Sequence, residues 1–255
     1  MPIVVFNQKG GVGKSTITCN LAAISAHQGL RTLVVDLDPQ GNSSHYLLGP
    51  DRPASPTVAD FFEHTLSYSF KSIPPNDFVG SSPFSGLDVM QASPALNELV
   101  VKLESRQKIY KLREALAQLG QTYDRIYVDT APALNFYTRA ALIGASACLI
   151  PFDCDSFSRQ ALYALMDNVA EIRADHNPNL GVAGVVVNQF QPRAKLPQRM
   201  VDELVADGLP VLQPYVPASV KIRESHELCL PLIHMDAQHK ATQAFVQLHD
   251  RLVAG

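Results

Sequence analysis

Short runs of apolar residues, many of them β-branched, alternate along the chain with longer amphipathic stretches. The apolar runs cover residues 2–7, 31–36, 124–129, 146–152 and 182–188. Runs without polar alternation are typical of strands buried on both faces of a parallel sheet, and the amphipathic stretches between them suit crossover helices. The pattern predicts an α/β fold, in which a mostly parallel, twisted sheet carries helices on both faces in three layers.

The amphipathic stretches predict helices at 14–28, 57–66, 95–119, 134–145, 157–174, 195–207 and 237–253. Gly29 follows the first of them as a residue that ends a helix. Residues 49–86 are the least regular part of the chain, with clusters of Pro, Ser and Asp. We interpret them as loops around one short helix, because the segments on both sides belong to one sheet. Residues 1–255 are therefore expected to form a single domain.

Composition limits the partners of this domain. The 255 residues include 21 basic and 24 acidic side chains, a formal net charge of −3, so any nucleic-acid surface must be a local patch. The four cysteines form no C-x-x-C pair and are expected to be reduced. No secretory signal is recognised, and no apolar run approaches the roughly 20 residues that span a bilayer. We expect a cytoplasmic protein.

The strongest chemical motif lies between the first predicted strand and the first predicted helix. It reads Gln8-Lys9-Gly10-Gly11-Val12-Gly13-Lys14-Ser15-Thr16. Glycines let backbone N–H groups curl around phosphates, and the helix N-terminus adds positive potential. Lys14 is expected to reach the β- and γ-phosphates of ATP, and the Ser15 hydroxyl to ligate Mg²⁺. The alternative, a glycine-rich turn that binds nothing, leaves the lysine and the serine unexplained.

This loop departs from G-x-x-x-x-G-K-[ST], because Gln8 replaces the first glycine and Lys9 adds a second lysine five residues before Lys14. In this form it resembles the deviant Walker A box of the ParA/MinD family of P-loop ATPases, in particular the ParA/Soj-like members without an N-terminal helix-turn-helix. Three further segments carry the resemblance along nearly the whole chain. They are Asp36–Asn42, similar to the first switch D-x-D-P-Q-G-N, Ile126–Pro132, similar to a Walker B strand and second switch, and Val216–Ser225.

The resemblance implies an ATP-dependent homodimer that hydrolyses ATP slowly with Mg²⁺. Lys14 would neutralise the phosphates, and Asp129 would hold Mg²⁺ together with Ser15. Asp38 would orient the attacking water, and Asp36 would have a structural or metal-shell role. Lys9 would cross the dimer interface to the partner's phosphates. The alternative for Lys9 is an exposed lysine beside its own loop.

Two residues are candidates for the adenine. The amide of Asn188 can both donate and accept, as a base edge requires, although an asparagine after a strand also commonly forms a turn. Pro217 would lie against the adenine by resemblance alone. With the loop, the expected cofactor-binding set is Lys9, Gly10, Gly11, Val12, Gly13, Lys14, Ser15, Thr16, Asn188 and Pro217.

The family's partners are DNA, membranes and activating proteins. The C-terminal residues 243–255 contain one basic side chain, so membrane binding is not expected. The candidate DNA-binding residues are Lys195, Arg199, Lys221 and Arg223, with Arg193 beside them. Ala218 stands where relatives often have arginine. A second basic run spans 102–113, with five basic side chains against one acidic. The alternative is that each run is only the solvated face of a helix, which is common for charged stretches.

Three hypotheses follow. The first is a DNA-dependent ATPase that positions a plasmid, a chromosome or a large cargo with a ParB-like or other activating protein, and that associates with the nucleoid. The second is a ParA-like regulator that acts through proteins without DNA. The third is a related metabolic or cofactor-handling P-loop enzyme, such as the nitrogenase iron protein or an amidoligase. An iron–sulfur cluster would need cysteines placed shortly after the Walker B strand, and the next cysteines along the chain, Cys148 and Cys154, are distant from it.

Overall fold

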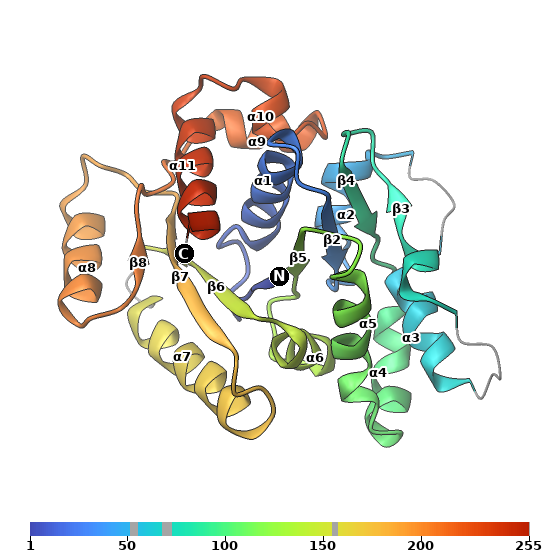
Figure 1. The fold of residues 1–255 in the computed structure, drawn as a ribbon. Helices are drawn as coiled ribbons and strands as arrows, with labels where there is room; N and C mark the ends of the chain where they lie inside the picture. Colours follow the sequence, from blue (N-terminus) through green and yellow to red (C-terminus); the bar gives the residue numbers. More distant parts are fainter. Residues whose placement is uncertain (52–55, 68–72, 155–157, 255) are drawn as a thin grey trace.

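One eight-stranded sheet forms the centre of the computed structural model, which describes residues 1–51, 56–67, 73–154 and 158–254 (Figure 1). The strand order is β3-β4-β2-β5-β1-β6-β7-β8, and every neighbouring pair is parallel except β3 and β4. The strands are β1 Pro2–Val5, β2 Thr32–Asp36, β3 Gly80–Ser81, β4 Leu87–Met90, β5 Arg125–Asp129, β6 Ala147–Asp153, β7 Gly181–Asn188 and β8 Val211–Leu212. The predicted mostly parallel α/β fold is confirmed.

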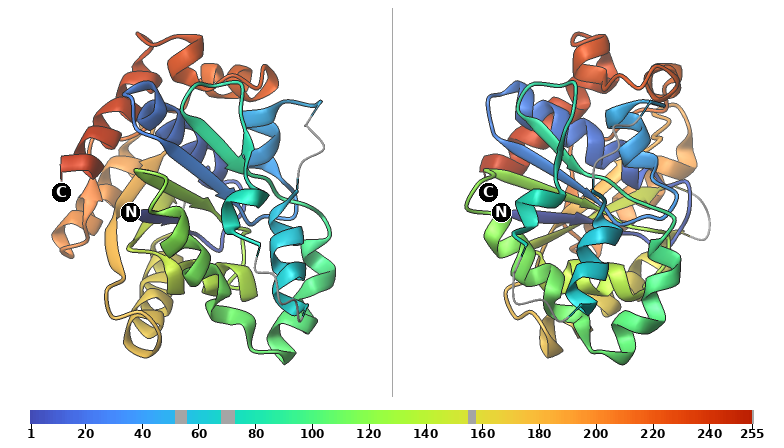
Figure 2. Two further views of the ribbon diagram at one scale, coloured as in Figure 1. Left: turned by 45° about the vertical axis from the view of Figure 1, so that its right-hand side comes forward. Right: turned by 90° about the vertical axis from the view of Figure 1, so that its right-hand side faces the viewer.

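Helices cover both faces of this sheet (Figures 1 and 2). They are α1 Lys14–His27, α2 Asn42–Leu48, α3 Val58–Leu66, α4 Leu96–Ser105, α5 Lys111–Leu119, α6 Phe136–Gly144, α7 Ser158–Asp175, α8 Lys195–Ala206, α9 Val220–Glu227, α10 Leu232–Met235 and α11 Lys240–Ala254, with 3₁₀ turns η1 Pro75–Phe78 and η2 Lys108–Tyr110. In Figure 1, α1 and α9–α11 lie on one side of the sheet, and α4–α7 lie on the other. No helix in the described ranges is long and apolar enough to cross a bilayer.

Alternate side chains of each central strand enter two separate apolar clusters. In β1, Val4 packs with the cluster under α3–α8, whereas Ile3 and Val5 pack with the cluster under α1, α2, α10 and α11. In β2, all five residues are buried. Full burial of one such valine or isoleucine contributes roughly 1.5–3 kcal/mol. The absence of polar alternation in these runs therefore reflects two covered faces, as predicted.

The helix predicted over 95–119 is wrong as one element. It is interrupted between α4 and α5 by Arg106, Gln107 and η2, and Gln107 takes a left-handed conformation with φ of 52°. The break turns the chain so that α5 packs on α6 while Ile109 lies against the same apolar cluster. Tertiary packing overrides a continuous helical pattern here.

Several short elements were not predicted. They are α2, α9, α10, β3, β4 and β8, each of eight residues or fewer, too short for a clear apolar period. The predicted helix 157–174 corresponds to α7, and its first residue lies outside the described residues. Residues 52–55 and 68–72 of the irregular region also lie outside them.

The topology gathers the chemistry at one edge of the sheet. β1 lies between β5 and β6, and β2 lies beyond β5, all parallel. Their carboxyl ends therefore point the same way, and ligands of doubly wound sheets bind at this edge, near the switch in strand order.

Candidate functional site

The phosphate-type loop connects β1 to α1 at this edge. Gly13 precedes α1 with φ of 94°, and Gly11 has φ of 76°, both in the left-handed region that glycine adopts without strain. A Cβ on Gly13 would also approach the Asn188 side-chain nitrogen to 2.2 Å. Glycine is thus required at position 13 by both conformation and space.

Backbone donors of the loop are left available. Within the described part of the chain, no group accepts a hydrogen bond from the amides of Gly10 to Thr16. The start of α1 has no side-chain cap and no acidic residue in its first turn. A curled row of open N–H groups at a helix N-terminus has the chemistry of an anion site.

Lys14 lies inside this loop with only 7% of its surface exposed. Its ammonium donates to the carbonyl oxygen of Lys9 at 3.0 Å. Burial lowers the pKa of Lys14, and the nearby carboxylates of Asp129 and Asp38 partly oppose that shift. The loop therefore holds a buried cation that faces acidic side chains, which is a fitting counter-charge for phosphates.

Asp129, fully buried at the end of β5, is one of the carboxylates that act on Lys14. Its carboxylate accepts a hydrogen bond from the Ser43 hydroxyl at 2.7 Å. Burial raises its pKa to about 6, and the nearby side chains of Ser15 and Ser43 lower it in part. The Ser15 hydroxyl and the Asp129 carboxylate thus lie near each other, and hard oxygen donors of this kind fit Mg²⁺.

Asp36 and Asp38 differ in what they contact. Asp36 is fully buried and accepts from the Ser44 amide at 2.8 Å, the Ser44 hydroxyl at 2.7 Å and the Asp38 amide at 3.1 Å. Burial and the neighbouring Asp129 raise the pKa of Asp36 to about 7. The Asp38 carboxylate has one described hydrogen bond, which it accepts from the Gln40 amide at 3.0 Å. Asp36 supports the turn, and Asp38 is the carboxylate left for chemistry.

Lys9 lies at the start of the loop, paired within its own chain. Its ammonium donates to both carboxylate oxygens of Asp153, at 2.9 and 2.7 Å. Sequence reasoning missed Asp153, although the signal was present, because it ends an apolar strand just as Asp36 and Asp129 do. Side-chain accessibility is 35% for Lys9 and 22% for Asp153, so the pair is neither deeply buried nor freely solvated.

The end of β7 closes the loop from the other side. The Asn188 side-chain nitrogen donates to the Val12 carbonyl at 2.9 Å, and that of Gln189 donates to the Gly11 carbonyl at 3.0 Å. The Asn188 carbonyl oxygen is buried without a hydrogen-bond partner among the described residues. A base with an exocyclic amine would supply the missing donor.

A pocket of about 220 Å³ opens beside the loop. It is lined by Gly11, Gly13, Thr16, Asn188, Gln189, Ala218, Ser219, Ile222, Arg223 and His226. Pro217 directly precedes this lining and bridges to Phe190 in a parallel β-bridge. The structure therefore brings the loop, Asn188 and the 216–225 segment together at one pocket.

The candidate DNA-binding residues are not brought together. Lys195 and Arg199 lie on α8 next to β8, whereas Lys221 and Arg223 lie on α9 on the α1 side of the sheet (Figure 1). Lys221 pairs with Glu224 at 3.1 Å, and Arg199 lies 3.6 Å from Glu203. The four basic residues, which are neighbours in the sequence, therefore lie at two separate positions in the structure, and each position has an acidic neighbour.

The second basic run is partly used for local structure. The Arg106 guanidinium donates to the Leu66 carbonyl, Lys111 pairs with Glu114 at 2.6 Å, and Arg113 lies 4.8 Å over the Tyr110 ring. These contacts tie η2 and its flanking helices to their neighbours.

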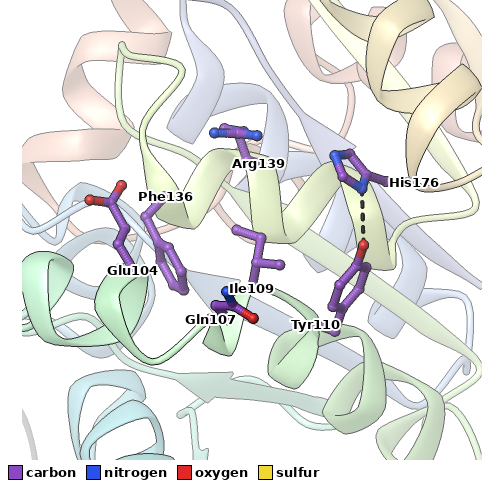
Figure 3. A pocket seen from close by; sticks show the side chains of 7 residues that line it. All are labelled: Glu104, Gln107, Ile109, Tyr110, Phe136, Arg139 and His176. Atoms are coloured by element: carbon purple, nitrogen blue, oxygen red, sulfur yellow. Dashed lines mark hydrogen bonds between the residues drawn. The ribbon is translucent and has the colours of Figure 1, made fainter.

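A larger pocket, of about 520 Å³, lies in that helical layer (Figure 3). Its lining comprises Glu104, Gln107, Ile109, Tyr110, Phe136, Arg139 and His176. The Tyr110 hydroxyl and the His176 ring are 3.0 Å apart. The pocket has no glycine-rich backbone, so its size does not make it the phosphate site.

Comparisons with known proteins agree with this geometry. A family model described as an AAA domain matches residues 1–182. The chain is 32% identical to the chromosome-partitioning ATPase Soj of Treponema pallidum, over 99% of this chain and 96% of that protein. Two solved structures share the fold. Cobyrinic acid a,c-diamide synthase of Mycobacterium smegmatis with bound ADP and magnesium has a TM-score of 0.83 at 23% identity, covering 99% of this chain and 93% of that one. An ATP complex of Cyanothece McdA has a TM-score of 0.86 at 18% identity, covering 99% and 96%.

Proposed function

This chain belongs to the ParA/MinD-type family of P-loop ATPases, and from that premise we propose that it is an ATP-dependent dimerising switch with slow, Mg²⁺-dependent hydrolysis. Its relative Soj is a chromosome-partitioning ATPase. We place this chain in the same general role of partitioning or positioning a cargo. All described elements attach to one sheet, which supports a single domain over residues 1–255.

One observation carries the proposal. Lys14 is buried in a loop of open backbone amides and faces Asp129 and Asp38 at the carboxyl ends of neighbouring strands. A polyphosphate with a divalent cation satisfies all of these groups at once. The amides and Lys14 take the phosphate oxygens, while Ser15 and Asp129 offer oxygen ligands to Mg²⁺.

The residue roles in hydrolysis follow from their contacts. Hydrolysis of a γ-phosphate needs charge neutralisation and an in-line water, and little else from the protein. Lys14 neutralises charge on the phosphates. Asp38 lies in the turn after β2 and is 6% exposed, and its carboxylate has one described hydrogen bond, so it can orient a water. Among the described residues, no glutamine or glutamate side chain is hydrogen-bonded to Lys14 or Asp38, which is consistent with slow turnover.

In this proposal, Lys9 provides the contact between the two copies of the dimer. In the single chain it is bound to Asp153, so reaching a second copy's phosphates requires that pair to open. The attraction of a trianionic or tetra-anionic phosphate chain for the Lys9 ammonium exceeds that of one partly buried carboxylate. ATP would then draw Lys9 across the interface and hold two copies together.

The test replaces Lys9 with Ala and, as a matched control, Asp153 with Asn. Lys9→Ala should bind ATP as a monomer but dimerise and hydrolyse poorly. Asp153→Asn removes the same ion pair while keeping the lysine, so it should still dimerise with ATP. Light scattering and ATPase rates, each with and without ATP, give the readout. Normal dimerisation of Lys9→Ala would make Lys9 a surface charge and end this part of the proposal.

Non-specific DNA is the proposed surface on which the switch acts, through Lys195, Arg199, Lys221 and Arg223, with a ParB-like or other protein as activator. All four side chains are on helices at the surface, and a homodimer presents two copies of each of them. Contacts of this kind go to phosphates and carry no base information.

A regulator that acts through proteins without DNA is the second candidate. The observation that favours it is the pairing of Lys221 with Glu224 and the separation of α8 from α9. Measuring ATPase activity with duplex DNA and with proteins encoded nearby distinguishes the two candidates.

The iron–sulfur form of the metabolic alternative is weaker on chemical grounds. Cys148 is fully buried in β6, and burial raises the pKa of its thiol to about 12. A cluster ligand must be an available thiolate. Cys148 is neither accessible nor inclined to ionise.

A further inference from the structure

Three helices meet at the imidazole of His226, beside the pocket next to the loop. The His226 Nε2 atom, on α9, lies 2.8 Å from the Thr16 hydroxyl in the first turn of α1. The same ring stacks on Tyr46 of α2, with centroids 4.1 Å apart and planes inclined by 20°. Nothing in the sequence motifs pointed to His226 or to Tyr46.

The partners of this ring are themselves held in place. The Tyr46 hydroxyl lies 2.8 Å from the Ser225 hydroxyl and accepts from the Asn20 side-chain nitrogen at 3.3 Å. Asn20 also donates to the Thr16 carbonyl at 2.9 Å. Tyr46, Asn20 and Ser225 are each at most 1% exposed. These contacts form a closed ring of partners on α1, α2 and α9, which holds the imidazole in one orientation.

This closed set of contacts forms part of the pocket wall. Thr16 and His226 both line the 220 Å³ pocket, together with Ile222 and Arg223 of α9. Within the described residues, the bond between His226 and Thr16 is the side-chain hydrogen bond that joins α9 to the loop and the start of α1. The distance between the α9 wall and the loop is therefore set at this contact.

The bond is one between neutral groups. Burial lowers the pKa of His226, and the neighbouring His45 lowers it further. The other titratable groups around the ring are Arg223 on α9, Cys229 just after α9 and Tyr46 on α2. The ring is therefore neutral at pH 7, and its hydrogen bond has the modest strength of an uncharged pair.

We propose that His226 is a positioning residue for nucleotide binding, which holds the α9 wall of the pocket against the phosphate loop through Thr16 and Tyr46. The proposal rests on the proposed ATP site. His226 acts through Thr16 and needs no contact with the nucleotide. Its effect belongs to ground-state binding, because Asp38, which would serve the attacking water, is not among the described residues that line this pocket.

The experiment is a double-mutant cycle on binding of a fluorescent ATP analogue. His226→Ala and Thr16→Val each remove one partner of the bond, and each is expected to weaken affinity about fivefold. The double variant should bind the analogue no more weakly than the weaker-binding of the two single variants, because both substitutions remove the same contact. His226→Gln keeps a polar atom near the Nε2 position and should recover most of the affinity. His45→Ala is the matched control, an exposed histidine in the same cluster that contacts Cys229 rather than Thr16.

Steady-state hydrolysis separates positioning from general damage. His226→Ala should raise KM for ATP and leave kcat unchanged. A variant that merely misfolds would instead show a lower apparent kcat, because a smaller fraction of the protein is active. Tyr46→Phe keeps the stacked ring and should behave closer to wild type than Tyr46→Leu. Additive effects in the cycle, or wild-type affinity of His226→Ala, overturn the inference. A wild-type protein that binds no ATP overturns the proposed function instead, so the two failures are distinct.

Discussion

The edge of the sheet at the loop and the basic helices α8 and α9 are built in opposite ways. At the loop, Lys14, Asp36, Asp38 and Asp129 are all less than 10% exposed, and described contacts hold each of them. On α8 and α9, Lys195, Arg199 and Arg223 are exposed or half-exposed side chains with acidic neighbours nearby. The side chains of the first region are held in place before any ligand binds, whereas those of the second region offer charge without a fixed arrangement.

That difference has an energetic consequence. A buried charge without its partner is costly, so substitutions at the loop edge should produce large, residue-specific effects. Exposed charges interact weakly and are screened by salt, so substitutions on α8 or α9 should produce small effects that depend on ionic strength.

The largest effect is expected from Lys14. Replacing it with Ala or Gln removes a buried cation that faces the expected phosphates, and ATP affinity should fall at least about a hundredfold. Equilibrium binding of a fluorescent ATP analogue measures it. Lys240→Ala, an exposed lysine at the start of α11, is the control and should bind normally. Unchanged affinity of the Lys14 variants would remove this loop from nucleotide binding.

Asp38 and Asp36 provide a contrast inside the loop edge. Asp38→Ala should leave ATP binding intact, lower kcat about a hundredfold and leave a persistent ATP-bound dimer in size-exclusion chromatography. Asp36→Ala should instead lower the melting temperature, because three hydrogen bonds lose their acceptor. Wild-type turnover in Asp38→Ala would refute its role in orienting water.

The basic helices are tested by charge reversal. Replacing Lys221 and Arg223 together with Glu should weaken binding to any duplex sequence and reduce the slope of affinity against salt concentration by about one per lost phosphate contact. Gel shifts with ATP, with ADP and without nucleotide, at two salt concentrations, measure it. Lys102→Glu with Lys108→Glu is the matched pair on the second basic run. If the ATP-bound wild type ignores DNA at low salt, the regulator that acts through proteins becomes the better proposal.

The smallest effect concerns pH. The pKa of Asp129 is raised to about 6 in the free protein, and a protonated carboxyl is a poor Mg²⁺ ligand. The Mg²⁺-dependent gain in ATP affinity should therefore be full near pH 8 and fall severalfold as pH drops below about 6. Titrations with and without Mg²⁺ at several pH values test this. A gain that stays constant down to pH 5 would exclude Asp129 as a ligand.

Much of the loop edge could be predicted from local sequence. A strand, a glycine-rich turn with Lys14 and Ser15, and carboxylates at the ends of the next strands all follow from residue type and spacing. Parallel strands then bring those ends together, whatever the details of packing. The approximate positions of the long helices followed in the same way from apolar periodicity.

The remaining features depended on which distant segments meet. Asp153 lies 144 positions from Lys9, and His226 lies 210 positions from Thr16, so no local pattern connects either pair. The sequence neighbours 195–223 separated onto two helices, and the stretch 95–119 broke to pack α5 on α6.

The sequence by itself determined the α/β class, the phosphate loop and the acidic strand ends of this protein. Only the tertiary structure decided that Lys9 is held by Asp153, that His226 meets Thr16, and that the basic residues divide between α8 and α9. The physical reason is that backbone periodicity and glycine conformation are local properties. Side-chain partners depend instead on how a twisted sheet brings remote helices into contact.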